Sequence, residues 1–199
     1  MYNLKRKIMK IIRILTILLF LNCFISTKVT AQSVTFEWQP DGSMLTNNGE
    51  MYEVIPFDGK SAEELYDNLM VSVSSIYNDP NQTISSVENK LISVYAIHEV
   101  VWDCGGILGE VVVNFHYTLK LHIKDAKVKV DAPNFTLLTF STGGSQSNIE
   151  GWVKAQKFFK EDGTPNPKKG KGEFCLRVSK SFNSLINNII DIESDNEDW

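Results

Sequence analysis

The stretch from Val111 to Val130 constrains the fold more than any other part of the chain. Every second residue from Val111 to Ile123 is apolar, and the same register resumes after Asp125-Ala126, a pair that predicts a tight turn. Side chains two positions apart on a strand lie on one face of a sheet. The pattern therefore predicts a β-hairpin with one face in a hydrophobic core, where each apolar side chain contributes about 1.5–3 kcal/mol when buried.

The opposite register of this hairpin is polar, and we expect it to face water. Its residues form a candidate partner surface: Asn114, His116, Thr118, Lys120, His122, Lys124, Lys127 and Lys129. The lysines could contact an acidic glycan or a lipid head group, or they could serve only to keep the hairpin soluble and to deter strand-to-strand aggregation. His116 and His122 share the face, but at roughly 3.3 Å per residue their Cα atoms lie about 20 Å apart. They therefore cannot bind one metal ion.

Helical patterns flank the hairpin on both sides. Ser61-Ala62-Glu63-Glu64 is a capping box, and the apolar spacing after it predicts a helix over about 61–77. A similar spacing predicts a C-terminal helix over about 173–193, and Ser147-Asn148-Ile149-Glu150 could cap a short helix. Further strands are predicted at about 33–39, 51–55, 82–88, 91–102 and 135–140. The order predicts an α+β fold: a one-sided antiparallel sheet of about five strands with two packed helices, β-α-β4-α.

The N-terminal residues have the pattern of a secretory signal peptide. Basic residues precede an apolar run from Ile14 to Ile25, and Val29-Thr30-Ala31 provides slim residues for cleavage. The run is too short to span about 30 Å of hydrocarbon, so we expect an exported protein that is not integral to the membrane after cleavage. Its location would be periplasmic, outer-surface or extracellular. A lipoprotein acylated at Cys23 is disfavoured, because Asn22 precedes it where such sites need a small residue.

The expected organisation follows from these patterns. Residues 1–31 are the signal peptide and 32–50 an N-terminal extended segment, and 51–193 form a single α+β domain. That domain divides into a core at 51–140, a loop-rich insertion at 141–172 and the C-terminal helix at 173–193, followed by an acidic tail at 194–199.

Removal of residues 1–31 changes the charge of the chain. The leader takes six of the 20 basic residues and none of the 24 acidic ones, which leaves 14 against 24, a formal charge of −10. Arg177 is then the one remaining arginine. A chain this acidic is repelled by nucleic acid and by anionic membranes, and it lacks the arginine forks that recognise phosphates and base edges. We therefore expect no nucleic-acid partner.

Two segments resemble a known family. Val54-Ile55-Pro56 followed by Lys60-Ser61-Ala62-Glu63-Glu64-Leu65-Tyr66 is similar to the opening of the bacterial domain of unknown function 4468, and residues 117–127 resemble its central hairpin. The resemblance covers about 51–140 and implies secretion and a TATA-binding-protein-like fold, but no activity. The family commonly has a glycine in the hairpin turn, where this chain has Ala126.

The name of that fold does not imply DNA binding. Fold alone does not determine function. A sheet that binds the minor groove needs basic residues and apolar wedges on its open face. The open face expected here instead offers Asn114, His116, Thr118 and Lys120.

Candidate catalytic and metal-binding groups are few. His98-Glu99-Val100-Val101-Trp102 lacks the second histidine of a zinc-protease motif and predicts a strand rather than the helix that motif needs. Cys104 and Cys175 could form a disulfide in an oxidising compartment, or they could be two buried thiols. We predict no catalytic residue, metal site or cofactor.

The four tryptophans divide by position. We expect Trp102 and Trp152 to close the core, whereas Trp38 and Trp199 lie in terminal segments and are freer to meet a partner.

These observations favour a non-enzymatic cell-envelope module that binds or assembles with an envelope protein or a glycan. One alternative is a secreted hydrolase whose site, including His98, is assembled from distant residues. Another is an accessory or inhibitor domain that docks another protein through its sheet edge.

Overall fold

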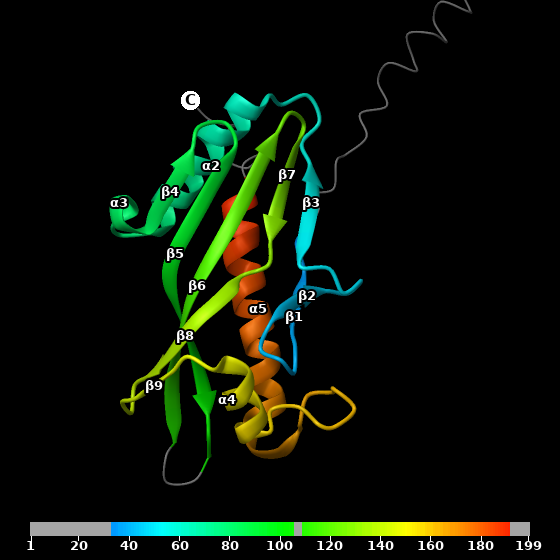
Figure 1. Ribbon diagram of the computed structural model, residues 1–199, viewed down its shortest axis with the longest axis vertical. Coiled ribbons are helices and arrows are strands. Elements are labelled where there is room, and N and C mark those ends of the chain that lie inside the picture. The colour runs from blue at the N-terminus through cyan, green and yellow to red at the C-terminus, as the bar shows by residue number, and fades with distance from the viewer. Residues whose placement is uncertain (1–32, 106–108, 192–199) are drawn as a thin grey trace, which may run out of the picture. The chain divides into compact units, whose positions relative to one another are not determined.

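The computed structural model describes residues 33–105 and 109–191, and residues from Ser33 onward form one compact unit. The predicted signal peptide with Cys23, and the acidic tail with Trp199, lie outside the described residues. The central hairpin is present as expected. It is formed by β6 (Glu110–Lys124) and β7 (Lys127–Asp131), and the predicted inward residues of β6 are all buried (Figure 1).

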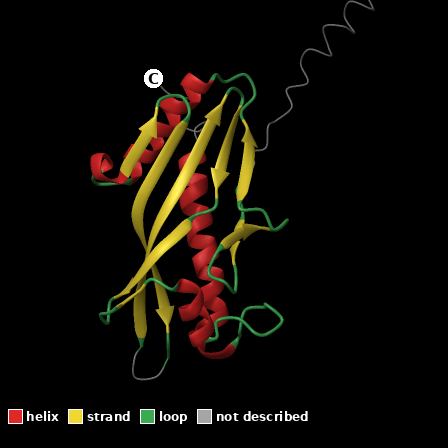
Figure 2. Cartoon of the chain, in the orientation of Figure 1, coloured by secondary structure: helices red, strands yellow, loops and turns green. Residues whose placement is uncertain are grey.

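One antiparallel sheet of seven strands contains this hairpin, with β3-β7-β6-β5-β4 as its main order (Figure 2). Strand β8 pairs with β6 beyond the end of β7, and β9 pairs with β8. The remaining bounds are β3 Tyr52–Pro56, β4 Ile84–Val87, β5 Leu91–Asp103, β8 Asn134–Phe140 and β9 Ser145–Gln146. The α+β class with a curled antiparallel sheet is therefore confirmed, with more strands than the five expected.

Helices α2 (Ala62–Ile76) and α5 (Lys171–Ile190) cover one face of the sheet (Figure 1). Ser61 caps α2 as predicted, and both hydrogen bonds of the capping box are present. Asp125, at the tip of the hairpin, accepts a further hydrogen bond at 2.8 Å from the first helical amide of Ala62. The shorter elements are α3 Pro80–Thr83, α4 Ile149–Gln156 and the 3-10 turn η2 Lys168–Gly170.

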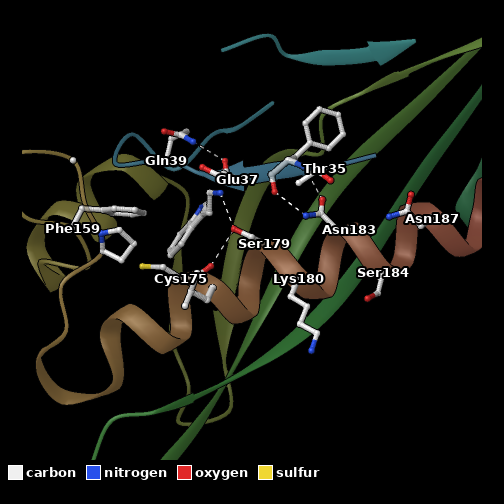
Figure 3. Close-up of a pocket in the computed structure, with 15 residues that line it drawn as sticks. Thr35, Glu37, Gln39, Phe159, Cys175, Ser179, Lys180, Asn183, Ser184 and Asn187 are labelled. Carbon is white, nitrogen blue, oxygen red and sulfur yellow. Dashed lines mark hydrogen bonds between the residues drawn. The ribbon is translucent and has the colours of Figure 1, made fainter. Parts of the chain in front are cut away.

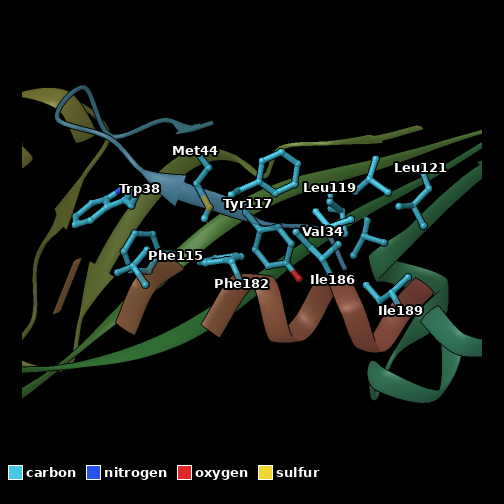
Figure 4. Packing of buried hydrophobic residues seen from close by; sticks show 14 of the residues in the cluster. Val34, Trp38, Met44, Phe115, Tyr117, Leu119, Leu121, Phe182, Ile186 and Ile189 are labelled. Atoms are coloured by element: carbon cyan, nitrogen blue, oxygen red, sulfur yellow. The ribbon is translucent and has the colours of Figure 1, made fainter. Parts of the chain in front are cut away.

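The N-terminal segment belongs to the core, which differs from its expected status as an extension before the domain. It forms β1 (Phe36–Trp38) and β2 (Met44–Thr46), a two-stranded sheet of its own. The side chains of Phe36, Trp38 and Met44 lie in the same hydrophobic cluster as the sheet and α5 (Figure 4). Trp38 is 3% exposed and contacts five other aromatic rings, so the expectation that it is free to meet a partner is wrong.

Strand β3 is an edge strand of the sheet. It pairs with β7 along one side and is the last strand in the main order. Ile55 is buried, but the side chains of Tyr52 and Val54 are 42% and 41% exposed. Of the apolar side chains in this strand, only Ile55 therefore reaches the core.

Candidate functional site

The candidate partner surface lies on the face of the sheet that α2 and α5 leave open. Directly opposite residues on neighbouring strands share a face, and the register of β6 with β7 pairs His122 with Lys129 and Lys124 with Lys127. The even-numbered residues of β6 therefore form one surface with the lysines of β7. The structure brings the basic half of the predicted set together, around the hairpin.

This basic half contains a hollow of about 340 Å³, lined by Val54, His122, Lys124, Lys127 and Lys129. We call it the basic hollow. Lys124 and Lys127 are direct cross-strand partners, an arrangement in which like charges destabilise a sheet. Neither lysine forms an ion pair with any residue that the structure describes. The two cations therefore have room and charge for an anion.

Asp131 is the acidic group beside this hollow. Its carboxylate accepts hydrogen bonds at 2.8 Å from both His122 Nε2 and Lys129 Nζ. Burial by itself would raise the pKa of Asp131, but the hydrogen bonds and charges of Lys129 and His122 outweigh it and lower the pKa. Lys129 also lies over the ring of Tyr52, with Nζ 5.3 Å from the centroid. Lys129 and His122 are thus held in place, whereas Lys124 and Lys127 are not.

The other half of the predicted surface is less exposed than expected. Thr118 is 9% exposed, between Tyr95 on β5 and Asn134 on β8, so its assignment to a water-facing partner surface is wrong. His116 and Asn114 are partly buried and hydrogen bond to Thr139 on β8 at 3.3 Å. Strand β8 pairs with this part of β6, and no local pattern in the sequence indicates that pairing. Lys120 lies further along the strand and is exposed.

His98 lies on the helix-covered face of β5. Its Nε2 is 2.5 Å from Ser181 Oγ on α5, and its ring packs against Phe182 with centroids 4.7 Å apart. Burial lowers the pKa of His98, and the nearby charge of Glu99 opposes this only in part. Because successive residues of a strand point to opposite faces, the Glu99 side chain lies across the sheet from the imidazole. His98 therefore joins β5 to α5 through this hydrogen bond and ring contact.

Cys104 and Cys175 are both free thiols, so of the two alternatives the structure has the unbonded one. Cys175 is buried on α5, and burial raises the pKa of its thiol to about 12. Burial and the charge of Asp103 also raise the pKa of Cys104. Because the thiolate is the reactive form, both shifts work against nucleophilic chemistry.

The larger hollow at about 590 Å³ is a groove between β1 and α5 (Figure 3). Polar side chains on α5 occupy its floor and bond to the backbone of β1. Asn187 bonds to both backbone groups of Val34 at 2.8 and 3.0 Å, and Asn183 does the same for Phe36 at 2.9 and 3.0 Å. Ser179 accepts from the amide of Trp38 at 2.9 Å. We call this set the amide ladder.

The amide ladder replaces a neighbouring strand. Alternate residues of a strand are about 6.8 Å apart, and positions four apart on a helix rise about 6 Å, so Ser179, Asn183 and Asn187 match the repeat of β1. These groups are committed to backbone bonds and give the groove a structural role. The stripe of Ser and Asn at spacing four in the amphipathic C-terminal helix is the signal from which the ladder could have been found.

The described part of the chain, residues 33–105 and 109–191, has no group of three or more His, Cys, Asp or Glu residues placed to hold a metal ion. None of its helices is long and apolar enough to cross a membrane.

The curled antiparallel sheet with helices on one face defines the chain as a TBP-like α+β protein. Residues 52–137 match the family described as a domain of unknown function with TBP-like fold, DUF4468. The resemblance of this chain to that family is therefore confirmed. No curated protein matches the sequence.

Two solved structures share the fold. A DUF4468 family protein from Bacteroides ovatus is similar over 86% of this chain and 95% of its own, with 13% identity and a TM-score of 0.54. A TBP-like protein from Parabacteroides distasonis is similar over 72% of this chain and 91% of its own, with 13% identity and a TM-score of 0.51. At this identity the likeness concerns the fold alone.

Proposed function

We propose that the protein is an exported, non-enzymatic binding module whose basic hollow holds an acidic glycan. The proposal of export rests on the pattern of basic and apolar residues before Ala31. The proposal of binding rests on one observation: Lys124 and Lys127 face each other across two strands without an acidic partner among the described residues. A soluble fold gains nothing from that repulsion, whereas an anion bound between the two lysines relieves it.

A glycan suits this surface better than a membrane. The mature chain has a formal charge of −10, so an extended anionic bilayer repels most of the molecule, whereas an oligosaccharide contacts only the basic hollow. Val54 lines the hollow and the Tyr52 ring lies under Lys129, and both side chains are partly exposed. An aromatic ring with one polar end is suited to such half-wet contacts, and here it lies beside the lysines that would hold the carboxylates or sulfates.

The test is the affinity of the purified chain without residues 1–31 for a sulfated hexasaccharide, measured by calorimetry, with a neutral hexasaccharide as reference. We expect binding of the sulfated sugar only, weakened by salt because exposed charges are screened. The double variant Lys124→Gln/Lys127→Gln should lose about tenfold or more in affinity, about 1.4 kcal/mol.

The matched control is Lys160→Gln/Lys168→Gln, which removes the same charge at exposed positions away from the sheet face. Equal losses in the two double variants would mean that net charge alone governs binding and would refute the assignment. Binding to vesicles of anionic lipid, with no binding of the sugar, would replace the glycan by a lipid head group.

A hydrolase is the competing class, because the 2.5 Å contact of His98 with Ser181 resembles a nucleophile with its base. We assign this pair a structural role, since Phe182 covers the ring. The expected result is that p-nitrophenyl ester and phosphate substrates show no turnover that depends on Ser181. Turnover lost in Ser181→Ala, with folding retained, would overturn the non-enzymatic assignment.

A further inference from the structure

Strand β5 has a free outer edge over more than half of its length. One side of β5 pairs with β6 from Leu91 to Asp103. On the other side β4 pairs only with Leu91 to Val94. Beyond Val94, no strand in the part of the chain that the structure describes pairs with this edge.

The hydrogen bonds at the far end of β5 show which residues face the free edge. The backbone of Val112 bonds to Ser141, on the side of β6 away from β5. Val101 is the register partner of Val112. Its backbone N–H and C=O groups must therefore also point away from the ladder between β5 and β6. Arg177 Nη1 confirms this, because it donates to Val101 O from outside the sheet at 2.8 Å.

By the same alternation, Tyr95, Ile97 and Glu99 direct their backbone N–H and C=O groups outward. None of these groups has a hydrogen-bond partner among the described residues. The edge is closed at one end by β4 and at the other by Arg177, which caps Val101. It is thus a bounded slot, which we call the β5 slot, with the length and polarity for one short extended segment.

Two apolar side chains border the β5 slot. Tyr95 and Ile97 are each 56% exposed and project from the open face of the sheet. Natural proteins usually protect a free edge with charged side chains, above all lysine, with proline or with a bulge. Between Tyr95 and Glu99 only Glu99 is of this kind. A weakly protected edge with exposed apolar groups is the geometry by which extended peptides add to a sheet.

The charges of the slot argue against a second copy of this chain as the occupant. The antiparallel register that pairs the two β5 slots, Tyr95 to Glu99, centres on Ile97 and places Glu99 opposite Tyr95 of the other copy, so neither Glu99 gains a basic partner. Two copies without residues 1–31, each with a formal charge of −10, also repel each other. A segment with a basic residue opposite Glu99 has neither disadvantage.

We propose that the β5 slot binds an extended segment of a partner protein, with a basic side chain opposite Glu99 and apolar side chains opposite Ile97 and Tyr95. Backbone hydrogen bonds to the outward groups of β5 hold the segment, and Glu99 selects its charge. This surface is separate from the basic hollow, and the proposal stands or falls independently of glycan binding.

The probe is a capped seven-residue peptide, Thr-Lys-Thr-Val-Thr-Val-Thr, labelled for fluorescence anisotropy; its lysine and two valines occupy every second position and so share one face. We expect it to bind the purified chain, whereas the same peptide with glutamate in place of lysine does not. Methylation of alternate backbone amides, which removes the donors but keeps the side chains, should weaken binding at least tenfold. Ile97→Lys, which places a charge at the edge, should weaken it similarly.

Charge reversal gives the decisive comparison. Glu99→Lys should reverse the preference, so that the glutamate peptide binds and the lysine peptide does not. The matched control is Glu63→Lys, an equal change of net charge at an exposed position on α2. Equal effects of the two substitutions, or full binding of the methylated peptide, would overturn the proposal and leave only non-specific attraction to an acidic protein.

Discussion

Asn183→Ala tests the amide ladder directly. The Asn183 side chain satisfies both backbone groups of Phe36, at 2.9 and 3.0 Å, and Phe36 is fully buried. Removing the amide leaves one donor and one acceptor of a core strand without partners. Each such orphan group costs about 1–3 kcal/mol. Because both bonds are only partly buried and water can reach them in part, we expect a total loss near the lower end, about 2–3 kcal/mol.

The matched control is Asn188→Ala on the same helix. Asn188 is exposed, and its side chain makes no hydrogen bond to the described part of the chain. Both substitutions gain the same helix propensity, about 0.5 kcal/mol, so the difference between the two variants isolates the ladder. We expect Asn188→Ala to leave stability unchanged or to raise it slightly.

Urea unfolding followed by circular dichroism, with linear extrapolation to water, measures both variants. Free energies of unfolding that agree within about 0.5 kcal/mol for Asn183→Ala and Asn188→Ala would refute a stabilising role of the amide ladder. That result would mean that apolar packing of Val34, Phe36 and Trp38 holds β1 and that the amide bonds contribute nothing net. If the amide ladder stabilises the fold, Asn187→Ala should also lower the free energy of unfolding, because Asn187 bonds to Val34 in the same way.

Two further substitutions test local features. Ala126 has φ of 60° in the hairpin turn, a left-handed conformation that costs a residue with a Cβ about 1 kcal/mol. Ala126→Gly should therefore raise the thermal midpoint by roughly 2–4 °C; a decrease in calorimetry would contradict this. Burial lowers the pKa of His98, so the unfolded chain binds a proton more readily than the folded one below about pH 6.5. The free energy of unfolding should fall as the pH drops from about 6.5 towards the pKa of His98 in the folded chain. In urea titrations at several pH values, His98→Gln should flatten this dependence. An unchanged pH dependence in the variant would exclude His98 as its source.

Local patterns predicted the elements whose signals are local. The alternation of β6 and the capping box at Ser61 each depend on residues close in sequence, and both are present as expected. The family's usual turn glycine is replaced by Ala126, and the structure resolves that difference by placing Ala126 itself in the left-handed region.

Contacts between residues far apart in the sequence could not be predicted. No local pattern indicates that β8 covers Asn114 and His116, or that Thr118 is buried between two neighbouring strands. The same limit applies to His98, whose partner Ser181 is 83 positions away. The basic hollow could be predicted because a hairpin with a two-residue turn fixes its own register, whereas the β5 slot depends on where β4 begins.

The amide ladder joins the beginning of the folded unit to its end. Asn187 lies 153 positions after Val34, and Asn183 lies 147 after Phe36. During synthesis from the N-terminus, β1 emerges early but must wait for α5, the last helix described, before its backbone is satisfied. Contacts that close such long loops form late. A chain that is cut or released before residue 179 therefore leaves the backbone groups of Val34, Phe36 and Trp38 without these partners, so β1 is fully satisfied only once α5 has been made.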